Sequence, residues 1–242
     1  FLCLSAQAQT TTVALDGSVH PSAAGWTYFG LGNSLTGTQA FTLADGVIEQ
    51  HTMGAGYAGQ GSNYFYTNIA MPLPSSWILR TRVRVAASEL WTYPFGAFVA
   101  FGNTGIGLMA NSMSLLFNGT WSTLAYQATA WHDYRMEVAA CGRWTLFIDD
   151  QFFQSGVGAN TQGTLPLAFG DGTGGANADV LYDFVELTVN TGQHADFNGD
   201  GHVNGADLGI LLSAWGQPGV TDLDCSGSTD GADLGILLSS WG

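Results

Sequence analysis

The feature of the sequence that most limits how this chain can fold is a tandem repeat at its C-terminal end. Residues 204–216 read NGADLGILLSAWG and residues 230–242 read DGADLGILLSSWG, so 11 of 13 positions are identical at a spacing of 26 residues. Such self-similarity indicates that one local unit is used twice. A single unit of this size cannot bury its apolar face alone, so we expect the two copies to pack together.

Each repeat begins with oxygen-bearing side chains at alternate positions of a 12-residue segment, the pattern of an EF-hand calcium loop. Glycine occupies position 6, where such a loop turns sharply, as Gly201 and Gly227. Because Ca²⁺ takes six to eight hard oxygen ligands, the sequence predicts two calcium sites. The candidate ligands are Asp196, Asn198, Asp200, His202 (through its backbone carbonyl), Asn204 and Asp207 in the first loop, and Asp222, Asp224, Ser226, Ser228, Asp230 and Asp233 in the second.

A short helix is predicted after each loop, because apolar residues then recur at i, i+3, i+4 and i+7. No helical pattern precedes either loop. Residues 196–242 contain seven Asp and no Lys or Arg, so we expect folding of this segment to be coupled to cation binding. The residues of the two apolar stripes are Leu208, Leu211, Leu212 and Trp215, and Leu234, Leu237, Leu238 and Trp241.

A calcium loop with Asp at position 12, no entering helix, one exit helix and a tandem duplication resembles a type I dockerin domain. The resemblance covers about 47 of the 242 residues. It implies two calcium-binding F-hand repeats that dock onto a cohesin-like protein. Positions 10 and 11 contribute to recognition in that family and are here Gly205-Ala206 and Gly231-Ala232, without the hydroxyls common in dockerins. A second hypothesis for the partner is further copies of this chain.

The sequence before residue 190 has the alternation of β-strands. Apolar residues alternate with Arg across residues 78–85 (ILRTRVRV), and the alternating segments 134–138 and 144–149 flank a turn-like ACGR. The chain has 34 glycines, and no long segment has a helical period. Such a pattern predicts an all-β sandwich. The expected domains are a sandwich over residues 10–190, a linker over 191–195 and the repeat module over 196–242.

The order of a central strand at 77–85, a hairpin at 131–150, and a glycine turn with a closing strand at 167–189 resembles the concanavalin A-like lectin/glucanase superfamily, the laminin-G-like jelly rolls. The expected fold class is therefore an all-β jelly-roll sandwich followed by a small α-helical dockerin-like domain. The resemblance also implies a carbohydrate-binding surface as one hypothesis, and a structural calcium ion at Asp183, with Asp16 or Asp171, as a third metal site.

The sequence does not carry the catalytic pattern of retaining glucanases, Glu-x-Asp-x-x-Glu, whose chemistry needs two carboxyl groups about 5 Å apart. None of the four glutamates begins it, and Asp149-Asp150 are adjacent, as in a turn. We therefore expect a non-catalytic protein, with a glucanase-type enzyme that lacks a recognisable motif as an alternative. The four glutamates are Glu49, Glu89, Glu137 and Glu186.

Aromatic and arginine clusters in the jelly roll each leave two interpretations open. The aromatic sets fit either a sugar platform or sheet packing. The arginines lie on one strand face and fit either an anionic glycan or ion pairs to Glu137 or Glu186 on neighbouring strands. The residues concerned are Tyr64 and Tyr66, then Trp91, Tyr93 and Phe95, and the arginines Arg80, Arg82 and Arg84.

A net charge of −14, with no lysine, argues against nucleic acid and anionic membranes as partners. Residues 1–9 (FLCLSAQAQ) have the apolar run and small-x-small site of a secretion signal, or form a strand that adds to a neighbouring subunit. No other stretch is apolar enough for membrane insertion. We therefore expect a secreted protein, extracellular or at the cell surface. Cys141 and Cys225 either bridge the two domains or remain unpaired.

Overall fold

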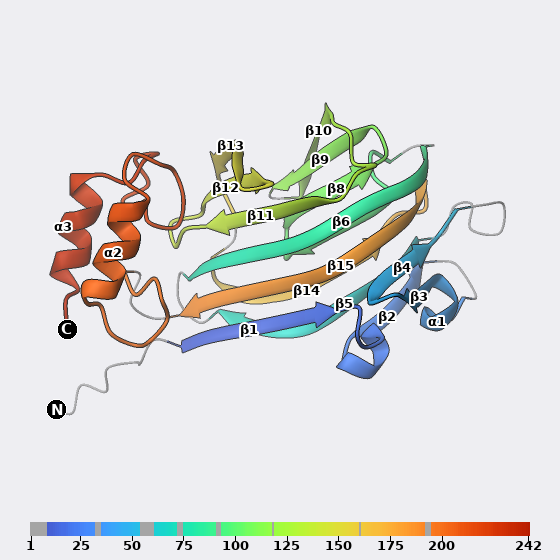
Figure 1. Cartoon of the computed structure of the whole chain (residues 1–242), viewed down its shortest axis with the longest axis horizontal. Helices are drawn as coiled ribbons and strands as arrows, with labels where there is room; N and C mark the ends of the chain where they lie inside the picture. The colour runs from blue at the N-terminus through green and yellow to red at the C-terminus, as the bar shows by residue number, and fades with distance from the viewer. Residues whose placement is uncertain are drawn as a thin grey trace.

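The computed structural model describes residues 9–31, 35–53, 61–71, 75–90, 93–117, 119–159, 161–191 and 195–242. In these residues two antiparallel β-sheets face each other, and a pair of short helices follows at one end of the sandwich (Figure 1). The first eight residues of the predicted signal, Trp91 and residues 192–194 of the predicted linker lie outside the described residues.

One sheet has the strand order β13-β12-β11-β6-β15-β4-β3, with β1 also paired to β15. Strands β6 and β15 form its centre and pair from Ser76 opposite Asn190 to Leu90 opposite Ala176. The strands are β1 (Gln9–Asp16), β3 (Phe41–Ala44), β4 (Val47–His51), β6 (Ser76–Leu90), β11 (His132–Val138), β12 (Arg143–Ile148), β13 (Gln151–Val157) and β15 (Ala176–Thr191). The hairpin expected around residues 140–143 is confirmed as β11–β12.

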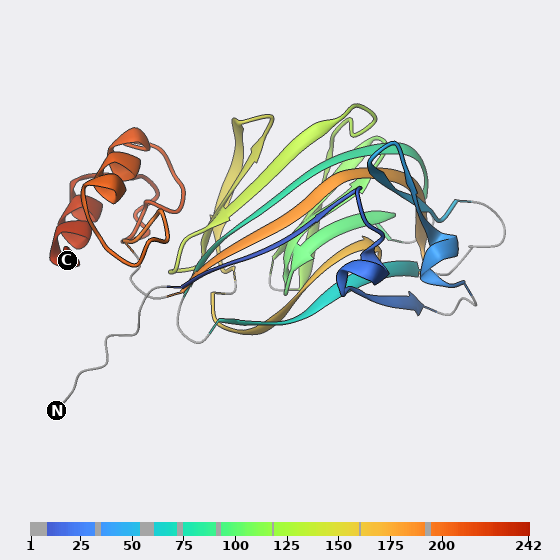
Figure 2. The same cartoon turned by 60° about the horizontal axis from the view of Figure 1, so that its bottom comes forward.

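The other sheet has the order β10-β9-β8-β7-β14-β5-β2. The two sheets confirm the predicted all-β sandwich, and their curvature is visible when the molecule is turned (Figure 2). The strands are β2 (Thr27–Leu31), β5 (Gly61–Met71), β7 (Ala97–Phe101), β8 (Thr104–Met109), β9 (Ser112–Phe117), β10 (Thr120–Ala125) and β14 (Gly163–Asp171), with the short helices η1 (Pro21–Ala24) and α1 (Gly37–Ala40) beside them.

The interior of the sandwich is rich in aromatic side chains. Phe169 of β14 packs edge-on against Trp26 and Tyr182, with ring centroids 5.2 and 5.1 Å apart. Tyr64 is fully buried in the same cluster, so for this residue sheet packing is the correct interpretation. Phe95 is also buried and lies tilted against Trp121, with the ring centroids 4.1 Å apart. Tyr93, in contrast, remains exposed.

A buried polar network crosses the interior at one end of the sandwich. The Tyr182 hydroxyl donates to Gln50 Oε1 at 2.9 Å, and Gln50 Nε2 donates to the carbonyls of Gly96 and Ala178 at 2.9 and 3.0 Å. Because these groups are fully buried, each hydrogen bond replaces one that water would otherwise make. The network therefore fixes β4 and β15 against the segment that contains Gly96.

The Tyr182→Phe substitution should lower the free energy of unfolding of the jelly roll by about 1.5 kcal/mol, because it removes one buried hydrogen bond and leaves Gln50 Oε1 unpaired. Equilibrium denaturation in urea measures this loss. Tyr93→Phe is the matched control, since Tyr93 is half exposed and should change the stability little. Equal stabilities of the Tyr182 variant and the unmodified protein would contradict the structural role of the network.

The C-terminal module is two loop–helix repeats, α2 (Gly205–Ser213) and α3 (Gly231–Ser239). Each helix begins with a capping box, in which Asn204 or Asp230 accepts a hydrogen bond from the backbone N–H two residues later. The small core contains Ala195, Val203, Leu211 and Leu237. Of the two predicted apolar stripes only Leu211 and Leu237 are fully buried, whereas Leu212, Trp215, Leu238 and Trp241 remain about half exposed.

Candidate metal centre

Asp207, at position 12 of the first loop, ties the beginning of the loop to the beginning of α2. Its Oδ1 accepts hydrogen bonds from the backbone N–H groups of Phe197 and Asn198 at 2.8 and 3.2 Å, and its Oδ2 accepts one from Asn204 at 2.9 Å. The side chain is fully buried. The predicted ligand at position 12 is therefore also the main organiser of the loop backbone.

The other polar side chains of the first loop hold its turns. Asp196 accepts from the N–H groups of Gly199 and Gly201 at 2.8 and 2.9 Å. Asn198 Oδ1 accepts from Asp200 N at 3.0 Å. Hydrogen bonds, first from the Asn198 side chain and then from the His202 backbone, lower the pKa of Asp200 and keep it ionised. Gly201 has φ +89°, a conformation that favours glycine, as expected at position 6.

The second loop repeats this arrangement with a tighter group of carboxylates. Asp233 accepts from the N–H groups of Leu223, Asp224 and Asp230 at 2.6, 3.0 and 2.7 Å. Asp222 Oδ2 accepts from Gly227 N at 2.9 Å. Carboxylate oxygens of Asp222, Asp224 and Asp233 lie within 4.8 Å of one another. Three carboxylates this close repel one another unless a cation lies between them.

Two further observations show that these residues fit a hard cation. Asp222 Oδ1 is buried and has no hydrogen-bond partner. Burial raises the pKa of the Asp222 carboxyl, although the Gly227 N–H and the Arg143 guanidinium oppose the shift. A buried carboxylate oxygen without a partner is costly in a folded protein, and a bound Ca²⁺ would supply the missing interaction. Asp222, Asp224 and Asp233 are thus the residues best placed to hold it.

The remaining predicted ligands lie around the two loops without completing such a group. In the first loop, Asn198 Nδ2 and Asn204 Nδ2 donate to Asp200 Oδ2 at 3.0 and 3.5 Å. In the second, the Ser226 hydroxyl donates to the Ser228 carbonyl at 3.2 Å. The His202 carbonyl accepts from Asn204 Nδ2 at 3.5 Å. The Asn amide groups and the Ser226 hydroxyl therefore donate to the oxygens for which a bound ion would compete.

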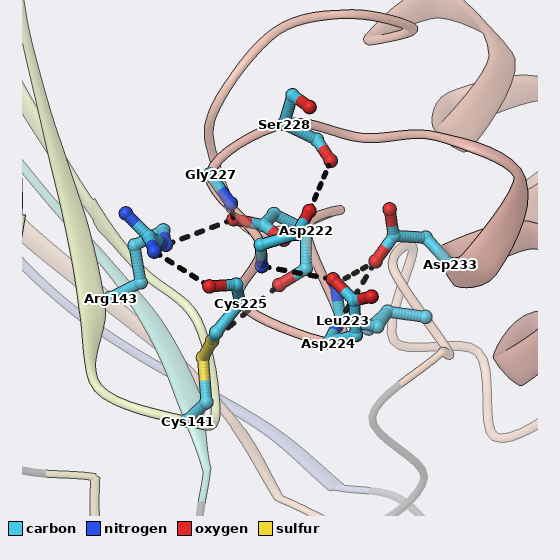
Figure 3. The surroundings of a disulfide bond; sticks show 10 residues. Cys141, Arg143, Asp222, Leu223, Asp224, Cys225, Gly227, Ser228 and Asp233 are labelled. Carbon is cyan, nitrogen blue, oxygen red and sulfur yellow. Dashed lines mark hydrogen bonds and ion pairs between the residues drawn. A yellow bond between two sulfur atoms is a disulfide. The ribbon is translucent and has the colours of Figure 1, made fainter.

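The jelly roll contacts the second loop directly (Figure 3). Cys141, in the β11–β12 turn, forms a disulfide bond with Cys225 at loop position 4, with 6.5 Å between the two Cα atoms. Arg143 Nη2 donates to the Cys225 carbonyl at 2.6 Å, and Arg143 Nε lies 3.0 Å from Asp222 Oδ2. The structure thus settles the alternatives for the two cysteines in favour of a bridge between the jelly roll and the repeats.

The third metal site expected in the jelly roll, at Asp183 with Asp16 or Asp171, stays a prediction. Asp183 pairs with Arg82 at 3.6 Å, Asp16 accepts a hydrogen bond from Ser18 N at 2.9 Å, and Asp171 is buried. The grouping of three metal-ligating side chains that the described residues provide is the one in the second loop.

Some of the charged side chains of the jelly roll form ion pairs, such as Arg82 with Asp183. Arg80 lies opposite Glu186 in the register of β6 and β15. Glu137 instead pairs with Arg135 on its own strand. Asp149 and Asp150 form the β12–β13 turn with φ values of 51° and 59°, as expected from their adjacency.

Two features of the structure were not predicted from the sequence: the position of Arg143 at the second loop and the burial of the Asp171 carboxyl. The signal for the first was weak: Arg143 is two residues from a cysteine whose partner lies in a calcium-like loop. Asp171 stands before a glycine-rich segment, GTGG, which is typical of an exposed turn. Its burial depends on packing between the two sheets.

The known proteins that this chain resembles are similar to it in fold. No protein-family model and no curated protein matches the sequence. Peanut lectin matches the structure with a TM-score of 0.52 and 9% identity, over 74% of this chain and 97% of the lectin chain. A carbohydrate esterase of the Shiga toxin-encoding bacteriophage phi24B matches with a TM-score of 0.50 and 15% identity, over 75% of this chain and all of the other.

Neither helix of the C-terminal module, nor any other helix in the described parts of the chain, has the length and apolar character needed to cross a membrane. The order of the strands, the two facing antiparallel sheets and the structural matches agree with one another. The β-sandwich of this chain therefore has a jelly-roll fold similar to that of peanut lectin.

Proposed function

We propose that this chain is a secreted, non-catalytic protein in which a lectin-like jelly roll is attached or assembled through a calcium-dependent, dockerin-like module. The observation that carries the proposal is the duplicated loop–helix unit, in which buried carboxylates converge next to helices that leave large apolar side chains exposed. Calcium has a structural role in this proposal, since the loops position the two helices.

The exposed apolar residues of the helix pair supply the docking face. Leu212 and Leu238 are 51% and 53% exposed, and Trp215 and Trp241 are each 47% exposed. Large exposed apolar side chains on both helices of a small domain that also carries seven aspartates favour a protein partner. We call these four residues the apolar helix face. The partner it fits is a cohesin-like protein.

Separate observations support the extracellular location of the protein and the role of the jelly roll. The Cys141–Cys225 disulfide supports an oxidising, extracellular location. The jelly-roll fold supports a glycan ligand, and the half-exposed Tyr93 is a candidate contact for it. The lack of the glutamate pattern of retaining glucanases supports a non-catalytic role.

Self-assembly into an extracellular filament or layer is the second candidate, and the duplication favours it. The two halves of the apolar helix face have nearly equal exposure, so one module presents two similar surfaces. Copies of this chain joined through such surfaces would form a chain of subunits or a closed pair.

Replacing Leu212 and Leu238 together by Asp should weaken association at least tenfold, because the change places two charges in the apolar helix face. Binding to a panel of cohesin domains by biolayer interferometry tests the first candidate. Sedimentation velocity of the purified chain tests the second. Both measurements are made in millimolar calcium and again in excess chelator.

Phe152→Asp is the matched control, because Phe152 is 52% exposed but lies on β13. It should leave association unchanged. Association that persists in chelator, or that the Leu212/Leu238 variant retains in full, would contradict a calcium-dependent docking role. A monomer that binds no cohesin domain under any condition would also overturn the proposal.

A further inference from the structure

The two predicted metal loops occupy equivalent places in the two repeats, but the jelly roll contacts them unequally. The second loop carries the disulfide to Cys141 and both contacts of Arg143. The backbone before this loop also lies against the β11 strand, since a Cβ atom added at Gly219 would be 2.9 Å from Glu137 Oε2. The first loop also lies against the jelly roll at Gly199, where an added Cβ atom would overlap Thr10 Oγ1. The bond there is an exposed hydrogen bond from Thr10 Oγ1 to the Gly199 carbonyl at 3.4 Å, and among the described residues no disulfide or ion pair joins this loop to the jelly roll.

Loop position 4 shows that the second repeat is adapted to this attachment. The first repeat has Gly199 there, with φ +73°, and the second has Cys225, with φ +61°. Side chains other than glycine, Asn or Asp rarely adopt this conformation, because their Cβ crowds the backbone. A cysteine at a glycine position is accounted for by the bond that it makes to the jelly roll.

Arg143 also balances the charge of the second loop. That loop has four aspartates and the first has three. The Arg143 guanidinium beside Asp222 leaves three uncompensated charges in the second loop, as many as in the first. Asp222 is fully buried and the Arg143 side chain is 18% exposed, so solvent screens this pair little.

We propose that Arg143 and the Cys141–Cys225 disulfide form an interdomain clamp that keeps the second metal loop ordered without calcium, whereas the first loop depends on calcium for its order. Without calcium, the positive charge of Arg143 offsets part of the repulsion between the carboxylates of the second loop. The disulfide limits how far this loop can open. Removal of calcium would thus release the first repeat while the second stays on the jelly roll. This inference rests on the proposed calcium-dependent function and assigns its regulation to the first loop.

Amide exchange of the whole oxidised protein tests the clamp, because each loop contains a matched reporter. Gly201 N–H donates to Asp196, and Gly227 N–H donates to Asp222, each at 2.9 Å. In calcium we expect both amides to be protected. In excess chelator, Gly201 should lose protection at least tenfold more than Gly227. Equal loss at the two glycines would overturn the inference.

Two variants extend the test. In chelator, Arg143→Met should lower the protection of Gly227 by about tenfold or more, because a buried charge loses its partner. Cys141→Ser with Cys225→Ser should also lower it. Arg82→Met is the control, since Arg82 pairs with Asp183 away from the loops, and should leave Gly227 unchanged. Full protection of Gly227 in both clamp variants would contradict the clamp.

The same experiment separates this inference from the proposed function. If calcium protects both loops equally in every variant, the clamp is wrong and calcium-dependent docking stands. If calcium changes neither Gly201 nor Gly227 in any variant, both the clamp and the calcium-dependent function are overturned.

Discussion

The double substitution Asp207→Ala and Asp233→Ala is expected to unfold the C-terminal helix pair even in millimolar calcium. Each of these buried carboxylates accepts three backbone hydrogen bonds in its loop and is a predicted calcium ligand. The loss of three hydrogen bonds to a charged group costs about 4 kcal/mol or more per repeat, before any lost metal binding. Four buried residues form the small core of the module, which cannot compensate for such a loss.

Circular dichroism at 222 nm and differential scanning calorimetry, both in calcium, measure this effect. The helical signal should fall, while the transition of the jelly roll should remain, because its core is separate from that of the helix pair. Asp183→Ala is the control, since Asp183 is partly exposed and pairs with Arg82 on the sandwich. A double variant with unchanged helical signal would show that the position-12 aspartates do not organise the loops.

The stability of the jelly roll should fall as the pH rises from about 4 to 8, and Asp171→Asn should remove this dependence. Burial raises the pKa of Asp171 to about 8 in the folded state, whereas an unfolded Asp has a pKa near 3.9. A group with a raised pKa binds its proton more tightly when folded. It therefore contributes most below the unfolded pKa, and the contribution is lost as the pH rises to the folded pKa.

The magnitude for Asp171 is on the order of 4 kcal/mol between acid and neutral pH. Asn has nearly the same shape and can still accept the hydrogen bond from Thr173 N, which is 3.1 Å from Asp171 Oδ1. Urea denaturation of both proteins at pH 5 and pH 8 provides the comparison. The Asn variant should gain several kcal/mol over the unmodified protein at pH 8 but far less at pH 5.

The exposed Asp133 provides a control for that comparison, since its side chain lies at the surface and Asp133→Asn should change the stability little. If Asp171→Asn also gives the same difference at pH 5 and pH 8, the buried carboxyl is not protonated in the folded protein.

The parts of the fold that could be predicted from the sequence are those set by residues close together along the chain. The β11–β12 hairpin follows from two alternating segments around a four-residue turn, and the two loops follow from side-chain spacing alone. The alternation of side chains along a strand likewise places Leu167, Phe169 and Asp171 on one face of β14. It does not show that this face points into the sandwich, so a buried Asp171 was not predicted.

Contacts between segments that are far apart along the chain could not be predicted from the sequence, because they depend on how the elements pack. Cys141 and Cys225 are 84 residues apart, and their pairing depends on how the helix module lies against the β11–β12 turn. The exposure of Leu212 and Trp215 was also not predicted. An apolar stripe indicates which side of a helix avoids water, but the number of neighbouring elements determines how much of that side is covered.

Calorimetric titration of calcium into the calcium-free protein, followed by circular dichroism, tests the central claim most directly. We expect two calcium ions to bind per chain and the helical signal to increase as they bind. The Asp207/Asp233 variant should bind neither ion. Protein that binds no calcium at millimolar concentration, or whose helical signal is the same with and without it, would contradict a calcium-organised docking module.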